Sequence, residues 1–245
     1  MEIKYAILGS DMNPLYLDFW SIISKVWVKK FNIIPVLGLI CDEDSDFIES
    51  EYGLIKKFKS IPGISNAMQS QIIRLYLPKY FPNDVCIISD IDMLPMSKKY
   101  FIDDLTQYTD NQIIIHSSDN PECNRSNEIP MCYNSAKGDN FTKIFGIDEI
   151  SWEQFAMELN QMGCGWFTDQ RFLWEKINQH KNNLNIVYLN RGWVGQAVNR
   201  IDRINWRYDP EMVKNDIYID SHLLRPYNEN KSRVDELINL VLWNL

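Results

Sequence analysis

The sequence predicts a single α/β domain over residues 1–245, built on a mixed, mostly parallel sheet that is flanked by helices. Two observations predict this class. Apolar segments typical of buried strands alternate along the chain with segments whose apolar residues recur at helical spacing. Polar and acidic residues directly follow several of the apolar segments. In sheets of this kind helices cover both faces, and ligands bind at the carboxyl ends of the strands.

The beginning of the chain predicts two strands with a helix between them. Residues 3–11 (IKYAILGSD) and 33–40 (IIPVLGLI) are short apolar segments typical of strands, and the second leads into the acidic stretch 41–46. Residues 16–31 place apolar side chains at helical spacing. The face that these side chains form consists of Phe19, Ile22, Ile23 and Val26.

A second helix and a buried strand come next. Ser65 is expected to cap a helix that ends near Pro78. Its apolar face consists of Met68, Ile72, Leu75 and Tyr76. Residues 85–88 (VCII) are apolar without interruption, which is typical of a strand that is buried on both faces.

The remaining segments continue the alternation to the end of the chain. In order they predict a strand within 112–119, a polar loop over 120–130, a strand over 129–138 that ends at Gly138, helices over 151–160 and from about Thr168, a strand over 185–190, and a helix over 231–245. Ser151 and Gln154 form a capping-box pattern at the start of the first of these helices. The last helix carries one apolar stripe, formed by Val234, Leu237, Ile238, Val241 and Leu242.

Composition excludes several classes of function. A net charge of −8 argues against a general nucleic-acid binder, because such a surface needs clustered Lys and Arg. No run approaches the roughly 20 apolar residues of a membrane helix, and no basic leader precedes a long apolar segment, so we expect a soluble, cytoplasmic protein. The five cysteines are odd in number and form no CxxC pair, which favours reduced thiols.

Asp90 and Asp92 follow the buried strand 85–88 with one residue between them. In an extended segment residues i and i+2 point the same way, so both carboxylates are expected to converge on one ligand. Two adjacent buried carboxylates repel each other unless a cation or hydrogen-bond donors meet them. Mg²⁺ and Mn²⁺ prefer such oxygen ligands and link them to substrate phosphates. The alternative is a turn at the end of the strand with solvated aspartates.

The segment NAMQSQIIRLYLPKYFPNDVCIISDIDMLPMS, residues 66–97, resembles the core of GT-A-fold glycosyltransferases. In that family a helix bearing an Arg precedes a buried strand that ends in a DxD motif. The resemblance implies a Rossmann-like GT-A fold and a nucleotide-sugar donor. It also implies that Asp90 binds the donor ribose and assists the metal, that Asp92 is a direct metal ligand, and that Arg74 neutralises the two aspartates and the diphosphate.

A second matching segment lies far along the chain, in DIYIDSHLLRPYNENK, residues 216–231. Many metal-dependent GT-A enzymes complete the metal site with a His near the end of the fold, followed by a basic residue on the donor phosphates. By resemblance, His222 is the third metal ligand and Arg225 binds the phosphates. The alternative is a structural role, which is common for a lone His.

The third matching segment is GCGWFTDQRFLWEK, residues 163–176. GT-A families often carry an acidic pair such as Asp-Gln at the start of this helix, on the acceptor side. The resemblance implies that Asp169 is either the catalytic base or a residue that positions the sugars, with Gln170 and Trp166 beside the acceptor. The alternative for Asp169 is an acidic residue that complements the helix macrodipole.

Weaker patterns allow two interpretations each. Gly9, Ser10 and Asp11 end the first strand, where GT-A enzymes bind the nucleoside, but they also fit an ordinary βα turn. Trp166 and Trp193 could stack on sugars or pack in the core. The basic residues Arg191, Arg200, Arg203 and Arg207 could meet phosphate, but pairing with the many acidic residues is the favoured interpretation.

These segments together predict a glycosyltransferase of the hexosyltransferase type, similar to small viral and bacterial enzymes, including those of chloroviruses. It is expected to move a sugar from a UDP-sugar to a glycan or other hydroxyl acceptor with Mn²⁺ or Mg²⁺. The alternatives are a haloacid-dehalogenase-like phosphatase, a sugar nucleotidyltransferase and a silent sugar- or nucleotide-binding module. The Asp-x-Asp motif of such phosphatases usually lies on the first strand, whereas here it lies at residues 90–92. Sugar nucleotidyltransferases carry a Gly-rich basic loop near the first strand, and this sequence has no such loop there. An inactive relative would typically lose an Asp of the DxD or the distal His.

Overall fold

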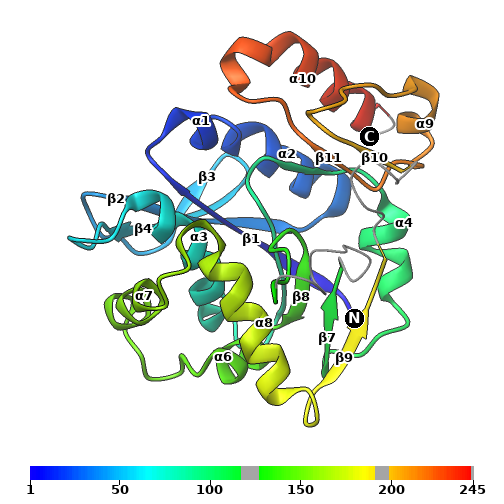
Figure 1. Ribbon diagram of the computed structural model, residues 1–245. Coiled ribbons are helices and arrows are strands. Elements are labelled where there is room, and N and C mark those ends of the chain that lie inside the picture. The colour runs from blue at the N-terminus through cyan, green and yellow to red at the C-terminus, as the bar shows by residue number, and fades with distance from the viewer. Residues whose placement is uncertain (117–126, 191–198, 244–245) are drawn as a thin grey trace.

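A computed structural model describes residues 1–116, 127–190 and 199–243, and within them eight strands form one sheet (Figure 1). In spatial order the strands are β3 (Ile48–Ser50), β4 (Gly53–Lys59), β2 (Ile34–Cys41), β1 (Ile3–Asp11), β5 (Val85–Ile88), β8 (Asn134–Lys137), β7 (Gln112–Ile115) and β9 (Asn185–Tyr188). The central block β4-β2-β1-β5 is parallel, as is the pair β7-β9. β3 and β8 run antiparallel to the strands beside them. The predicted class, a mixed and mostly parallel sheet, is confirmed.

Helices cover both faces of this sheet (Figure 1). On one face lies α2 (Trp20–Phe31), against which α10 (Tyr227–Val241) packs. The other face carries α3 (Asn66–Tyr76), α6 (Gly138–Phe145), α7 (Trp152–Gln161) and α8 (Thr168–His180). The short helices are α1 (Pro14–Leu17), α4 (Lys98–Phe101), α9 (Pro210–Lys214) and the 3₁₀ segments Leu77–Tyr80, Asp103–Leu105 and Gly165–Phe167. Among the described residues, none of these helices has the length and apolar content needed to cross a membrane.

The predicted helix starts are confirmed by their capping contacts. The Ser65 hydroxyl accepts a hydrogen bond from the backbone N–H of Met68 at 3.3 Å, which caps α3. Ser151 and Gln154 form both bonds of the predicted capping box at the start of α7. Each bond satisfies a backbone group that the first turn of a helix leaves without an intrahelical partner.

Some predicted boundaries are wrong. The strand predicted over 129–138 is confined to Asn134–Lys137, and Gly138 begins α6 instead of ending the strand. A Cβ on Gly138 would lie 2.2 Å from the carbonyl oxygen of Phe81, so only glycine permits this close approach. The terminal helix begins at Tyr227, before the predicted residue 231. Most of the predicted polar loop 120–130 lies outside the described residues.

A small second sheet, which the sequence did not predict, connects distant parts of the chain. It consists of β10 (Arg200–Ile201), β11 (Asp220–His222) and β6 (Met93–Pro95). β11 is antiparallel to β6, and His222 is opposite Met93 in the register. The backbone N–H of Leu223 also donates to the carbonyl oxygen of Asp92 at 3.0 Å. This pairing places His222 beside the DxD segment although 130 residues separate them in the chain.

Candidate active site

The carboxyl ends of β1 and β5 lie at the same edge of the main sheet, because these neighbouring strands are parallel. A cavity of about 280 Å³ opens there. The residues that the resemblance assigned to the site line it, namely Gly9, Ser10, Asp11, Arg74, Asp90, Asp92, Trp166, Asp169, Gln170, His222 and Arg225. The structure therefore brings together candidates from the ends of β1, β5 and β11, from α3, and from the start of α8.

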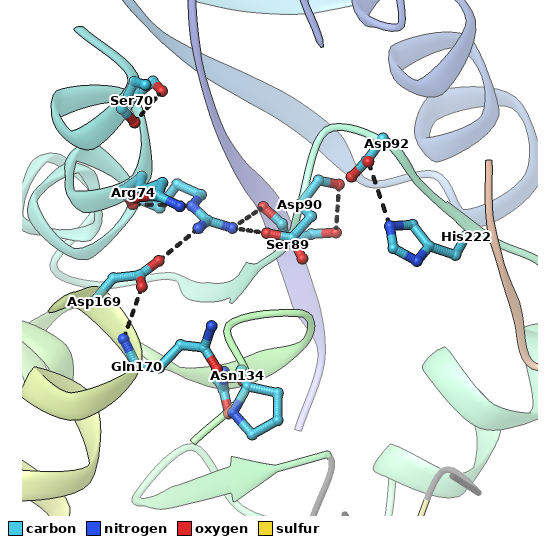
Figure 2. A network of polar contacts seen from close by, with 12 residues as sticks. Ser70, Arg74, Ser89, Asp90, Asp92, Asn134, Asp169, Gln170 and His222 are labelled. Carbon is cyan, nitrogen blue, oxygen red and sulfur yellow. Dashed lines mark hydrogen bonds and ion pairs between the residues drawn. The ribbon is translucent and has the colours of Figure 1, made fainter. Parts of the chain in front are cut away.

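Arg74 lies at the centre of one polar cluster (Figure 2). Its side chain comes from α3 and is almost fully buried. One guanidinium nitrogen, Nη2, is 2.8 Å from Oδ2 of Asp169, and Nη1 contacts Oδ1 of Asp90. Nη1 also donates to the carbonyl oxygen of Ser89 at 3.3 Å. Arg74 thus links the end of β5 to the start of α8.

Burial and charge act against each other in this cluster. Burial, with a smaller contribution from nearby Asp90, raises the pKa of Asp169 to about 6 and outweighs the opposing charge of Arg74. Burial lowers the pKa of the Arg74 guanidinium, but Asp90 and Asp169 more than compensate, so the net shift is upward. Arg74 therefore stays charged, while Asp169 takes up a proton more readily than an exposed Asp does.

Asp92 forms a second cluster with three cationic side chains. Its Oδ2 lies 3.0 Å from Nη1 of Arg203, 3.4 Å from Nε2 of His222 and 3.5 Å from Nε of Arg225. Burial opposes ionisation of Asp92, but the contact with His222 and the charges of Arg203 and Arg225 lower its pKa to about 2. Burial likewise opposes the charged imidazole, yet contacts with Asp202 and Asp92 raise the pKa of His222.

The two aspartates of the DxD do not point at one ligand in this structure. Figure 2 shows Asp90 directed to Arg74 and Asp92 directed to His222. The expectation of convergence assumed an extended segment, and that assumption is wrong. Residues 91 and 92 form a turn, in which the backbone N–H of Met93 donates to the carbonyl oxygen of Asp90 at 3.2 Å. Ile91, the residue between the two aspartates in the sequence, is buried.

The fit of a divalent cation depends on these positions. The described residues contain no group of three or more His, Cys, Asp and Glu side chains that is arranged to hold a metal. Asp92 and His222 are nevertheless in contact, and a carboxylate with an imidazole suits Mn²⁺. Asp90, the third predicted ligand, points to Arg74 and away from His222. Asp92 and His222 are the two predicted ligands that contact each other, so they are the pair that would hold a cation.

The end of β1 borders the same cavity. Ser10 is buried, and its hydroxyl donates to the carbonyl oxygen of Asp11 at 2.9 Å. Tyr16, which the sequence did not single out, accepts a hydrogen bond from Nη1 of Arg225 at 2.6 Å. The Arg225 guanidinium also lies 5.0 Å from the centre of the Tyr16 ring. Tyr16 thus holds Arg225 at the cavity.

Gly9 is needed for the close packing of β1 on α3. A Cβ at this position would lie 2.1 Å from the carbonyl oxygen of Ser70 and 3.0 Å from Cγ of Arg74. We expect Gly9→Ala to lower the free energy of unfolding by about 1–3 kcal/mol, because overpacking forces backbone shifts. Chemical denaturation measures this loss. Gly146→Ala is the control for a glycine with open space around it, and its cost would come only from a φ of +68°.

The acceptor-side candidates lie at the mouth of the cavity and beside it. Trp166 is 54% exposed, in the 3₁₀ turn before α8. Gly165 permits that turn, because its φ of +57° is in the left-handed region. The backbone N–H of Gln170 donates to Oδ1 of Asp169 at 2.8 Å. An exposed Trp at a cavity mouth is available for stacking, so core packing does not explain Trp166. Trp193 lies outside the described residues.

Two of the four basic residues pair with acids, as the sequence interpretation favoured. Arg200 forms an ion pair with Asp220, and Arg203 forms one with Asp92. Arg207 is exposed, and Arg191 lies outside the described residues. Arg203 nevertheless lines the cavity, a placement that the sequence did not reveal. The charge pattern alone could not predict which arginine reaches the DxD. Arg203 does so because it follows β10, which pairs with the distant strand β11.

Comparison with known proteins supports the fold. No family model and no curated protein matches the sequence. Among solved structures, the galactosyltransferase LgtC in complex with donor and acceptor sugar analogs is similar at 13% identity, with a TM-score of 0.50 over 96% of this chain and 95% of that one. The bifunctional glycosyltransferase WbbM gives 12% identity and a TM-score of 0.49 over 96% of this chain and 49% of that one. The GT-A fold that the sequence predicted is confirmed.

Proposed function

We propose that the protein is a glycosyltransferase that moves a sugar from a UDP-sugar to a hydroxyl of a glycan or other acceptor, with Mn²⁺ or Mg²⁺ bound. One observation carries this proposal. Carboxylate, imidazole and guanidinium groups from segments far apart in the sequence surround a single cavity at the carboxyl edge of the sheet. That edge is where open α/β sheets bind nucleotides. The similarity in fold to LgtC agrees with the proposal.

On the donor side, Asp92 and His222 would hold the cation. A divalent cation supplies charge neutralisation for the leaving diphosphate. Arg225 is charged, lies 3.5 Å from Asp92 and lines the same cavity, so it is placed to bind a donor phosphate. Asp90 and the end of β1, with Gly9, Ser10 and Asp11, would contact the nucleoside.

On the acceptor side, the contacts of Asp169 favour a positioning role over a role as base. A general base must be within hydrogen-bond reach of the hydroxyl that it deprotonates. Asp169 is 1% exposed, its Oδ2 is held by Arg74 and its Oδ1 accepts the backbone N–H of Gln170. We therefore assign Asp169 to orienting the sugars, with Gln170 and Trp166 beside the acceptor.

Calorimetric titration of UDP with and without Mn²⁺ tests the proposal. The native protein is expected to bind UDP at least about tenfold more tightly with Mn²⁺, a difference of about 1.4 kcal/mol. Asp92→Ala is expected to remove that gain. Asp84→Ala is a matched control, because Asp84 precedes the other end of β5 and pairs with the exposed Lys4. UDP binding that is indifferent to Mn²⁺, or unchanged in Asp92→Ala, would contradict the metal bridge.

Two other outcomes would replace the proposal. Hydrolysis of p-nitrophenyl phosphate that is lost in Asp90→Ala would make the protein a phosphatase of the haloacid-dehalogenase type. Tight Mn²⁺-dependent UDP binding without turnover of any tested UDP-sugar would make it a silent nucleotide-binding module.

A further inference from the structure

His222 lies between two carboxylates, and only one of them faces the cavity. Its Nε2 is 3.4 Å from Oδ2 of Asp92, which lines the cavity. Its Nδ1 is 3.5 Å from Oδ2 of Asp202, which does not line the cavity. A neutral imidazole donates from one ring nitrogen and accepts at the other. Oδ2 of Asp92 is already met by Arg203 at 3.0 Å and by Arg225 at 3.5 Å. The carboxylate behind the ring, Asp202, is therefore the one that can decide which nitrogen of the neutral ring carries the proton.

We propose that Asp202 is a positioning residue for His222: it accepts the Nδ1–H and leaves the lone pair of Nε2 facing the cavity beside Asp92. The tautomer itself does not depend on the proposed function. Only its purpose does, because the lone pair of Nε2 would bind the divalent cation. Histidines that bind metals usually donate their other ring N–H to a carboxylate or carbonyl, which fixes both the tautomer and the ring orientation.

The local structure holds Asp202 in place independently of His222. Oδ1 of Asp202 accepts the backbone N–H of Ile204 at 2.8 Å, and its backbone carbonyl accepts the N–H of Asn205 at 3.0 Å. The preceding residues Arg200 and Ile201 form β10, whose partner β11 carries His222. The Asp202 side chain is only 14% exposed. One carboxylate oxygen therefore fixes the turn, and the other is free to meet Nδ1.

Asp202→Asn is expected to keep the contact that stabilises the turn and to change the contact with His222. The turn needs an acceptor opposite the N–H of Ile204, so the amide oxygen is expected to stay there. The amide nitrogen then replaces Oδ2 and presents a donor to Nδ1. The expected consequence is the opposite tautomer, with the proton on Nε2, where it blocks the lone pair that faces the cavity.

The direct readout is the tautomer of His222 in the metal-free protein, measured by ¹⁵N NMR at a pH high enough that the ring has lost its charge. Only three histidines occur in the chain, and His222→Gln identifies the signal. We expect an Nδ1–H ring in the native protein and an Nε2–H ring in Asp202→Asn. Asp209→Asn is the matched control, because Oδ1 of Asp209 accepts the N–H of Glu211 in the same way at 2.9 Å.

A second readout is the dissociation constant of Mn²⁺ in the presence of UDP, measured by electron paramagnetic resonance. Loss of such a partner typically weakens metal binding about 10- to 100-fold, and we expect a loss in this range for Asp202→Asn and no change for Asp209→Asn. An Nε2–H ring in the native protein, or a tautomer unaltered in Asp202→Asn, overturns the proposal. If the tautomers behave as expected and the native protein does not bind Mn²⁺, the positioning role stands and the metal in the proposed function fails.

Discussion

Arg74→Met is expected to lower the free energy of unfolding by about 3–5 kcal/mol, the usual cost of removing one partner from a buried ion pair. The Arg74 guanidinium is the cation that contacts both Asp90 and Asp169. Asp169 is buried at the start of α8, so its carboxylate cannot recover the lost contact from water. Methionine keeps most of the side-chain volume, so that the loss reports charge more than packing.

Denaturant unfolding at pH 7 measures this loss, and two further variants show where it comes from. Lys143→Met removes an ion pair between exposed side chains on α6 and is expected to cost less than about 1 kcal/mol. Adding Asp169→Asn to Arg74→Met removes one uncompensated charge and should restore part of the stability. A loss below about 1 kcal/mol for Arg74→Met would mean that the two carboxylates reach water without Arg74.

The sequence predicted the parts of this site that depend on local structure. The capped helix α3, the buried strand β5 and the start of α8 follow from periodicity and capping residues that lie within each segment. Arg74, Asp90 and Asp169 could be named because each lies at a fixed place on such an element. The strands β3 and β4 were missed because β4 is rich in lysine and only partly buried, so its residues show no continuous apolar run.

The parts that depend on non-local pairing could not be predicted from the sequence. The second sheet consists of strands of two or three residues, which are too short to show a pattern, and it places Asp202 and Arg203 around His222 and Asp92. The turn within the DxD could not be predicted either. Its two carboxylates contact different partners that are distant in the sequence, Asp90 with Arg74 and Asp92 with His222. The resemblance to GT-A enzymes nominated His222, but it gave no indication of Asp202.

The difference in unfolding free energy between the native protein and Asp169→Asn is expected to change with pH by roughly 3 kcal/mol, at about 1.4 kcal/mol for each unit of pKa shift. Burial raises the pKa of Asp169 from 3.8 to about 6, so the folded protein binds this proton more tightly than the unfolded chain does. Stability therefore falls as the pH rises from about 4 to 6, and the loss is complete above that range. Asp169→Asn has no such proton, so it is expected to lack this decline.

Unfolding curves recorded from pH 4 to 8 on both proteins test this, and subtraction removes the contributions of the other groups. Asp92 has a lowered pKa and loses its stabilising effect only as the pH falls below about 4, whereas His222 has a raised pKa and loses its effect as the pH rises above 6.5. Because the charge of Arg74 holds the pKa of Asp169 down, Arg74→Met is expected to move the transition to higher pH. A native protein that gains stability between pH 4 and 6 relative to Asp169→Asn would mean that the ion pair with Arg74 outweighs burial. In that case Asp169 would be ionised throughout this pH range, and the cavity would carry one more negative charge toward the acceptor at acidic pH.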